Sequence, residues 1–444
     1  MTKPNEKKAS VPKRTDPTLS LCMIVRDEEA FLPRCLESVK NAVDEMIIVD
    51  TGSEDRTVEI AESYGAKVYR HPWRDSFSEA RNYGLQFATG DWILQLDADE
   101  RLEQEDIPLL RRLIGSDRYN GILVAIYNFP SGLSPSGRGL DGEISKFYYE
   151  RVFRRGKAHY EGIVHNQVVL EGKRMPSEIR LYHYGYNLSR EKMQAKWDRT
   201  TKLLKRQIAQ NPNDAFARFN LVRNYRSQGR FDLGIAEGKK ALERLCRGEG
   251  KAESRKPKAE SRLMIVYEMA NCLLRKGEYE EAEKLCLAAL AEDDRHPDLM
   301  FTLGSVYLKS ERYREAAQMF HRFLEARAEY MGRLQEGSLL VDTLGYDYAA
   351  YNGLGFCYQK IGDRERAIEH FQRSIEANPQ YITAHRNLAI CWREQGRFDR
   401  AGDIYHVLGD YQRAIQSYEK HLASHPGDPH ALVMIANSYG YSEL

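Results

Sequence analysis

The sequence predicts an α/β domain with a mostly parallel sheet, followed by an all-helical solenoid. Three observations lead to this fold class. Strand-like and helix-like segments alternate between residues 19 and 96, the apolar runs end in acidic residues, and a self-similar helical pattern recurs after residue 212. Alternation of strand and helix is typical of right-handed βαβ units, and a recurring helical pattern is typical of a solenoid.

Composition limits the classes of partner. The chain has 444 residues, 66 Lys and Arg against 65 Asp and Glu, and a net charge of +1. Because these charges nearly balance, the chain has no strong overall electrostatic field, and we expect no nucleic-acid partner and no attraction to a membrane surface. The seven cysteines are scattered singly, which disfavours disulfides and zinc. No apolar run approaches the roughly 18 residues of a membrane span, so we expect a cytoplasmic protein.

The first half of the α/β domain begins with a strand at Leu19 to Val25, an apolar run with β-branched members. A helical face follows over residues 31 to 41, with apolar residues three and four apart. A second buried strand is predicted over residues 45 to 49. Ser53 is then expected to cap a helix that runs to Tyr64.

The second half starts with a strand over residues 67 to 70 and a helix over residues 77 to 88. A fourth apolar run, residues 92 to 96, is too short for a periodic helix and predicts a buried parallel strand. Asp97 and Asp99 come directly after it. They would therefore lie at the carboxyl edge of the sheet, where open α/β sheets bind ligands.

Acidic residues follow three of the predicted strands, with Glu28 after the first, Asp50 after the second, and Asp97 and Asp99 after the fourth. Two carboxylates spaced i, i+2 can approach one divalent cation, which in turn can hold a diphosphate. The glycine-rich motifs of dinucleotide oxidoreductases and P-loop enzymes do not occur in the sequence, which disfavours both classes.

Four ordered motifs resemble those of family 2 glycosyltransferases with the Rossmann-like GT-A fold. They are LCMIVRDE (21–28), IIVDTGSEDRT (47–57), ARNYGL (80–85) and GDWILQLDADE (90–100). The resemblance covers roughly residues 19 to 101 in the correct order and spacing. It implies a nucleotide-sugar donor, expected to be a UDP-sugar, bound at the carboxyl edge of the sheet.

The resemblance assigns donor-binding roles to residues at this edge. Asp50 would contact the base or ribose of the donor, with Arg26 and Glu28 nearby, and Arg81 would lie close to the donor. Plainer explanations stay open at this stage. Arg26 and Glu28 can form an ion pair on an exposed turn, Asp50 can cap the following turn, and Arg81 can be a solvated helix residue.

The resemblance also assigns the metal site. Asp97 would face the ribose or sugar and share the metal site, while Asp99 would bind Mn²⁺ or Mg²⁺. His183 would complete the coordination, and its imidazole suits Mn²⁺ better than Mg²⁺. Alternatively, His183 and its tyrosine neighbours pack the domain against the next helix.

Two later segments, YEGIVHN (160–166) and LYHYGY (181–186), resemble motifs of glycosyltransferases that carry tetratricopeptide repeats. In many of these relatives the first motif ends in His-Glu, whereas this sequence has His165-Asn166. Sugar transfer with inversion needs a base for the proton of the acceptor. The candidates are His165 and Glu161.

Three further features occur in the middle third. The glycine- and serine-rich segment from Ser131 to Gly142 is a loop that can order over the substrates or simply connect two elements. A strand is predicted over residues 146 to 154. Its basic residues can pair with a diphosphate or lie on a solvated face; they are Arg151, Arg154 and Arg155.

The C-terminal half contains recurring glycine turns, each followed by an aromatic residue and an alanine. They fit the tetratricopeptide repeat (TPR) of about 34 residues. Residues 325 to 347 lengthen one connection, and the turns at Gly396 and Gly409 are only thirteen residues apart, so one helix is lost or shared there. The concave surface of such an array commonly binds a peptide or protein; the alternative is that the array dimerises or stabilises the chain.

The predicted division is a disordered tail (1–18), a GT-A domain (19–187), a linking helix (188–211) and a TPR domain (212–444). The predicted function is an inverting, metal-dependent glycosyltransferase. The resemblance makes a protein or peptide acceptor in the TPR groove plausible, since relatives of this layout include enzymes that glycosylate peptides or flagellar proteins. The alternative is a non-catalytic TPR scaffold or adaptor with a degenerate sheet domain, favoured by Asn166 in place of Glu.

Overall fold

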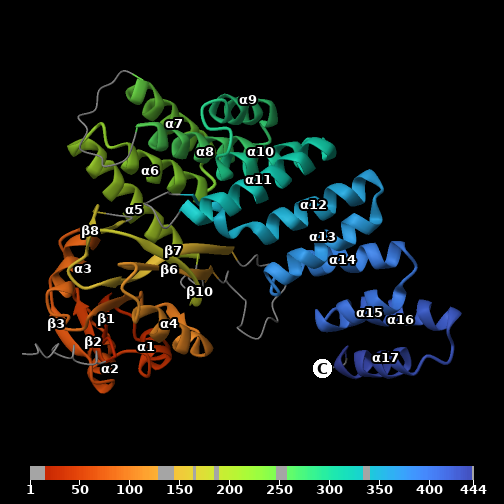
Figure 1. The fold of residues 1–444 in the computed structure, drawn as a ribbon, viewed down its shortest axis with the longest axis horizontal. Coiled ribbons are helices and arrows are strands. Elements are labelled where there is room, and N and C mark those ends of the chain that lie inside the picture. Colours follow the sequence, from red (N-terminus) through yellow and green to blue (C-terminus); the bar gives the residue numbers. More distant parts are fainter. Residues whose placement is uncertain are drawn as a thin grey trace, which may run out of the picture.

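A computed structural model describes residues 16–128, 145–163, 167–184, 190–246, 258–333 and 341–442. Figure 1 shows an N-terminal α/β domain and a long series of helix pairs that sweeps from above it around one side. None of the helices in the described ranges has the length and apolar run needed to cross a membrane. The α/β domain followed by an all-helical array confirms the fold class predicted from the sequence.

The main sheet has eight strands in the order β3-β2-β1-β4-β7-β6-β10-β5. Its parallel half follows the apolar runs of the sequence and consists of β1 (Leu19–Val25), β2 (Glu45–Asp50), β3 (Lys67–Arg70) and β4 (Trp92–Gln95). The other half is mixed and consists of β5 (Glu100–Leu102), β6 (Gly121–Asn128), β7 (Ser145–Arg154) and β10 (Arg174–His183). A separate hairpin pairs β8 (Ala158–Glu161) with β9 (Gln167–Leu170).

Side chains alternate between the two faces of the sheet, as the pleat requires. Along β1, Leu21 and Met23 join the larger core, while Cys22 joins a smaller core on the opposite face. The larger core also receives residues from α1 (Leu32–Val39), α2 (Thr57–Ser63) and α4 (Ile107–Ile114). The opposite face is covered by α3 (Phe77–Leu85) and the β8-β9 hairpin.

Two local predictions need correction. Helix α2 begins at Thr57, not beside Ser53, because Asp55 Oδ1 accepts the N–H of Thr57 (2.9 Å) while Ser53 Oγ accepts the N–H of Asp27 (3.1 Å). Thr18, assigned to the disordered tail, is instead held by Asp91, whose Oδ2 accepts its backbone N–H at 2.9 Å.

The linking helix α5 (Arg190–Gln210) leads into the repeats. They comprise α6 (Ala215–Ser227), α7 (Phe231–Cys246), α8 (Lys258–Lys276), α9 (Tyr279–Leu290), α10 (Pro297–Lys309), α11 (Tyr313–Arg333), α12 (Asp347–Ile361), α13 (Arg364–Ala377), α14 (Ile382–Glu394), α15 (Phe398–Val407), α16 (Tyr411–Ser424) and α17 (Pro429–Ser442). The 3₁₀ turn η2 (Thr343–Gly345) lies between α11 and α12. Residues 325 to 333, expected in a lengthened connection, belong to α11.

Small residues let the paired helices approach closely. A Cβ on Gly355 of α12 would lie 2.6 Å from the ring of Phe371 in α13. Between the closely spaced turns at Gly396 and Gly409 lies one helix, the ten-residue α15, which packs against both α14 and α16.

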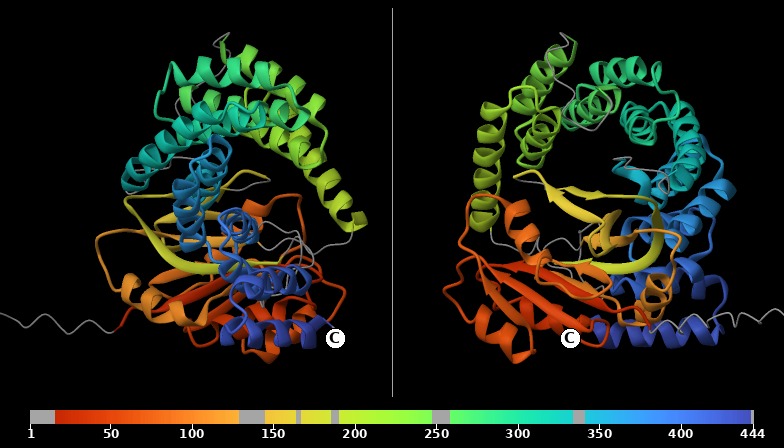
Figure 2. Two further views of the ribbon diagram at one scale, coloured as in Figure 1. Left: turned by 90° about the vertical axis from the view of Figure 1, so that its right-hand side faces the viewer. Right: turned by 60° about the vertical axis from the view of Figure 1, so that its left-hand side comes forward.

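The repeats form an arch over the sheet domain, as Figure 2 shows. Two apolar clusters join the two parts. Ile163, after β8, packs against a cluster that contains Leu204 of α5 and Leu221 of α6. Leu123 of β6 packs with Tyr330 of α11 and with Leu344 of η2. The array is thus attached to the α/β domain at two separate places.

Candidate active site

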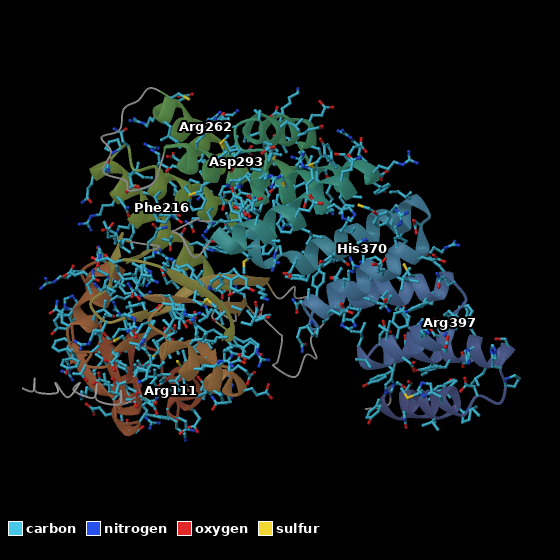
Figure 3. All side chains as sticks on the ribbon, viewed as in Figure 1. Arg111, Phe216, Arg262, Asp293, His370 and Arg397 are labelled. Atoms are coloured by element: carbon cyan, nitrogen blue, oxygen red, sulfur yellow. The ribbon has the colours of Figure 1, made fainter. Side chains whose placement is uncertain are left out.

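The carboxyl ends of β1, β2 and β4 meet at one edge of the sheet. The parallel registers pair Val25 with Asp50 and Cys22 with Gln95. The acidic residues that follow these strands therefore lie at neighbouring positions, as the sequence predicted. Polar side chains from other elements contact them. Figure 3 draws the side chains of the described residues on the ribbon.

Asp97 is anchored through both of its carboxylate oxygens. Oδ1 accepts hydrogen bonds from Arg81 Nη2 (2.6 Å) and Gln95 Nε2 (3.1 Å), and Oδ2 accepts one from Arg151 Nη2 (3.2 Å). Burial raises the pKa of Asp97, but the charges of Arg81 and Arg151 outweigh burial and hold it below its ordinary value. Asp97 is therefore an ionised, oriented carboxylate.

Glu100 contacts both Asp97 and Arg151. It is 1% exposed, and its Oε1 accepts from Arg151 while its Oε2 accepts the backbone N–H of Asp97 at 2.9 Å. Arg151 also donates to Gln95 Oε1. Arg151 is itself buried on β7, so a single guanidinium joins three side chains around the Asp97 turn.

Asp99 faces His183. The Oδ2 of Asp99 lies 3.3 Å from the Nε2 of His183, and the Nδ1 of His183 lies 2.7 Å from Asn128 Oδ1. Asn128 Oδ1 is an acceptor only, so the Nδ1 of His183 carries the proton in this pair. Burial lowers the pKa of His183, but the hydrogen bond and the charge of Asp99 outweigh burial and raise it above its ordinary value. A cation bound by Asp99 would take the place of the Nε2 proton, and Asn128 at Nδ1 would keep the ring oriented as in a metal-binding histidine.

These two side chains fit a hard or borderline divalent cation. One carboxylate oxygen and one imidazole nitrogen are suitable ligands for Mn²⁺, and Mg²⁺ commonly takes only one or two carboxylates with substrate phosphates. Across the described residues, no group of three or more His, Cys, Asp or Glu side chains is arranged to hold a metal ion. The remaining ligands would have to come from water and the substrate.

Glu28 is near enough to Asp97 and Asp99 for their charges to affect its pKa. Burial raises the pKa of Glu28 to about 7, and the negative charges of Asp99 and Asp97 contribute to the increase. Its backbone N–H donates to Thr57 Oγ1 at 2.7 Å, which ties the end of β1 to the start of α2. The edge thus concentrates negative charge that a cation would offset.

Asp50 and Arg26 have local partners. Asp50 is 5% exposed, and its Oδ1 accepts the backbone N–H of Ser53 at 3.0 Å, so it caps the turn after β2 as one of the plainer explanations held. Arg26 Nε lies 3.7 Å from Asp27 Oδ2 on the exposed turn. The ion-pair partner of Arg26 is therefore Asp27 and not Glu28.

Arg81 is placed by α3. The helix begins after Ser76, whose Oγ accepts the N–H of Glu79 (3.2 Å), and this start sets the face on which Arg81 lies. The Arg81 side chain is 11% exposed, and its guanidinium carbon lies 5.3 Å from the centre of the Tyr160 ring. The alternative of a solvated helix residue is wrong.

Only one of the two candidate bases lies among the described residues. His165, with Asn166, lies outside the described residues, as does the loop from Ser131 to Gly142. Glu161 ends β8 and is exposed, with its Oε1 2.9 Å from His159 Nε2. Because strand side chains alternate, Glu161 points away from its buried neighbour Tyr160.

Four polar residues of this site carried no assigned role there in the sequence analysis: Gln95, Glu100, Asn128 and Arg151. Arg151 was considered only as a diphosphate partner or solvated residue, and the two arginines at and just after the end of β7 are also engaged in the fold. Arg154 donates to Ser116 O (2.7 Å), and Arg155 donates to Gly90 O (2.8 Å). No local sequence signal could have found the role of Arg151, because it depends on β7 pairing with β4.

Comparisons with known proteins agree with the two-part fold. The family model "Glycosyl transferase family 2" matches residues 20–169, and tetratricopeptide repeat models match residues 273–336, 348–381 and 402–432. A TPR repeat-containing protein of Synechococcus elongatus is 34% identical over 309 residues, which cover 68% of this chain and 72% of that protein.

Two other relatives are named as glycosyltransferases. The SPbeta prophage-derived glycosyltransferase SunS of Bacillus subtilis is 26% identical over 213 residues, 46% of this chain and 49% of SunS. An uncharacterized glycosyltransferase of Rickettsia typhi is 39% identical over 104 residues, 23% of this chain and 35% of that protein. Both similarities concern only part of each protein.

Proposed function

The chain belongs to the family 2 glycosyltransferases that carry tetratricopeptide repeats, and from that membership we propose an inverting transfer of a sugar from a nucleotide-sugar donor. The observation that carries the proposal is the pairing of Asp99 with an oriented His183 beside the anchored Asp97. We further propose that Arg26, Glu28, Asp50 and Arg81 border the donor, which we expect to be a UDP-sugar.

The residues have distinct proposed tasks. Asp99 and His183 would hold Mn²⁺ or Mg²⁺, which would supply positive charge for the departing nucleoside diphosphate. Asp97, fixed by Arg81 and Arg151, orients the turn and presents a rigid carboxylate edge to the ribose or sugar. Because both of its oxygens are already bound by cationic or amide donors, we assign it a smaller share of metal binding than the sequence suggested.

Inverting transfer requires two changes at the anomeric carbon and one proton transfer. The nucleophilic atom of the acceptor forms a bond to this carbon, the bond to the diphosphate oxygen breaks on the opposite face, and the acceptor proton passes to a base. We keep His165 and Glu161 as the candidate bases. A protein or peptide acceptor delivered by the repeats is the proposed substrate class.

The adaptor alternative lacks comparable support. The buried trio of Arg151, Asp97 and Glu100 stabilises the fold under either reading, but a degenerate site would have no use for the pairing of Asp99 with a His183 that Asn128 orients. The relatives named as glycosyltransferases also favour an enzyme.

The test is release of nucleoside diphosphate from a panel of UDP-, GDP- and dTDP-sugars with Mn²⁺. Wild type is compared with Asp99→Asn, and with Asp232→Asn as a control at a carboxylate that is 83% exposed on α7. We expect release from one donor by wild type and the control, and its loss in Asp99→Asn. Equal release by Asp99→Asn and wild type would contradict the assignment of this site.

A further inference from the structure

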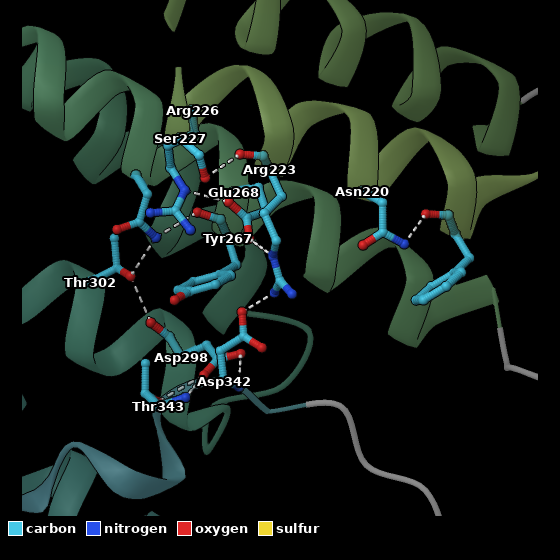
Figure 4. A network of polar contacts seen from close by, with 12 residues as sticks. Asn220, Arg223, Arg226, Ser227, Tyr267, Glu268, Asp298, Thr302, Asp342 and Thr343 are labelled. Carbon is cyan, nitrogen blue, oxygen red and sulfur yellow. Dashed lines mark hydrogen bonds and ion pairs between the residues drawn. The ribbon is translucent and has the colours of Figure 1, made fainter. Parts of the chain in front are cut away.

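The residues just before α12 lie inside the arch formed by the repeats. We call residues 341–346 the wedge; they include the 3₁₀ turn η2. The wedge touches α10, α11 and α12 of the repeats and also β7 of the sheet. Figure 2 shows the arch that surrounds it, and Figure 4 shows the polar contacts at its repeat side.

The carboxylate of Asp298, in the first turn of α10, binds backbone groups of the wedge. Its Oδ1 accepts hydrogen bonds from the backbone N–H (2.8 Å) and hydroxyl (2.7 Å) of Thr343, and its Oδ2 accepts the N–H of Asp342 (3.1 Å). Asp298 is 2% exposed and Thr343 is fully buried. The wedge is therefore held as a bound peptide would be, by its main chain.

Arginines on α6 recognise the wedge by charge. Arg223 donates from Nε to Glu268 Oε1 (2.7 Å) and from Nη2 to the carboxylate of Asp342. Arg226 donates to the second oxygen of Glu268 (2.6 Å), and Glu268 is fully buried in α8. Since Glu268 fixes Arg223, the arginine is oriented before it meets Asp342, and charge-assisted bonds of this kind are strong and directional.

The opposite side of the wedge rests on the sheet. A Cβ added to Gly345 would lie 2.0 Å from the backbone oxygen of Lys146 in β7, so only glycine fits there. Leu344 is 3% exposed and packs with Leu123 of β6, and its carbonyl accepts from Arg327 Nε at 2.5 Å. One short segment thus contacts the sheet and the repeat helices α6, α10, α11 and α12.

We propose that the wedge is an internal ligand of the repeat array, which occupies the inner side of the arch at α6 and α10 and locks the array to the sheet through Arg223, Asp298 and Gly345. Contacting domains usually move relative to each other unless their interface is large or specifically anchored. Where the proposed transferase function holds, the acceptor must use the inner surface from α12 onward, because the wedge fills the earlier part.

Hydrogen–deuterium exchange of the full chain tests the lock without any substrate. The variants are Arg223→Gln and Asp342→Asn, each alone and together. Losing one charge-assisted bond should speed exchange about tenfold in residues 341–347 and in β7. Because Asp342→Asn removes only the pair that Arg223→Gln already breaks, the double variant should exceed Arg223→Gln by no more than about twofold.

Two further variants keep the result decisive. Gly345→Ala should speed exchange in β7 while the backbone bonds to Asp298 keep α10 protected. Asp232→Asn, which removes an exposed ion pair with Lys276, should leave exchange in both regions unchanged. Faster exchange of the wedge with no change in β7, in every variant, would show that the wedge does not lock the two parts together. Since no donor or acceptor is present, that outcome is independent of any failure of the transferase assay.

Discussion

Removing the buried guanidinium of Arg151 should destabilise the α/β domain far more than the loss of a surface ion pair. The Arg151 side chain is 8% exposed and pairs with Asp97 (3.2 Å) and with Glu100, whose side chain is 2% exposed. In Arg151→Met, Asp97 keeps Arg81, but Glu100 is left buried without a counter-charge. Breaking a buried pair in this way costs about 3–5 kcal/mol.

The second variant, Arg151→Met with Glu100→Gln, separates the charge effect from lost packing. It removes the unpaired carboxylate, so the double variant should be more stable than Arg151→Met alone, with a residual loss of about 1–3 kcal/mol from unmet hydrogen bonds. Pulse proteolysis in urea, with peptides of the α/β domain quantified by mass spectrometry, measures this domain separately from the repeats. A loss below about 1 kcal/mol for Arg151→Met, the size of a surface pair, would refute the reasoning.

Three further changes have defined outcomes. Burial raises the pKa of Glu45, but several hydrogen bonds, including one from Ser20, lower it from 4.5 to about 2. The resulting stabilisation is present above pH 4.5 and is lost as the pH falls toward 2. Glu45→Gln should therefore flatten the acid side of a pH–stability profile. Gly90→Ala places a Cβ 2.6 Å from Ser20 Oγ and 2.8 Å from its N and should cost about 1–3 kcal/mol, measured by urea unfolding. Asn128→Ala removes the bond that orients His183 (2.7 Å) and should weaken Mn²⁺ binding about 10- to 100-fold, measured by isothermal titration in the presence of UDP.

Strands β1, β2 and β4 of the parallel half could be predicted because each is largely buried on both faces and appears as a continuous apolar run. β1, for example, starts and ends where the run from Leu19 to Val25 does. The start of α2 could not, because the choice between Ser53 and Asp55 as hydrogen-bond acceptor depends on Asp27, which lies on another strand end. Local signals are reliable where burial decides and fail where a distant partner decides.

The same limit applies to the site. Asp97 and Asp99 could be located from one strand and its end, but Arg151 lies on β7, which inserts antiparallel between β4 and β6. No local pattern places that strand next to Asp97. The wedge was missed for a related reason, because residues 325 to 347 resemble a plain connection until α11 is seen to extend through Arg333 and Asp342 to contact α6.

The most direct test of the central claim is a crystal structure of the full chain with Mn²⁺ and UDP, with the metal located by anomalous scattering. The account predicts a manganese peak bound by Asp99 and His183, with the diphosphate on the same ion at the carboxyl edge of β1, β2 and β4. A nucleotide bound at this edge without manganese on Asp99, or manganese bound only elsewhere on the chain, would contradict it.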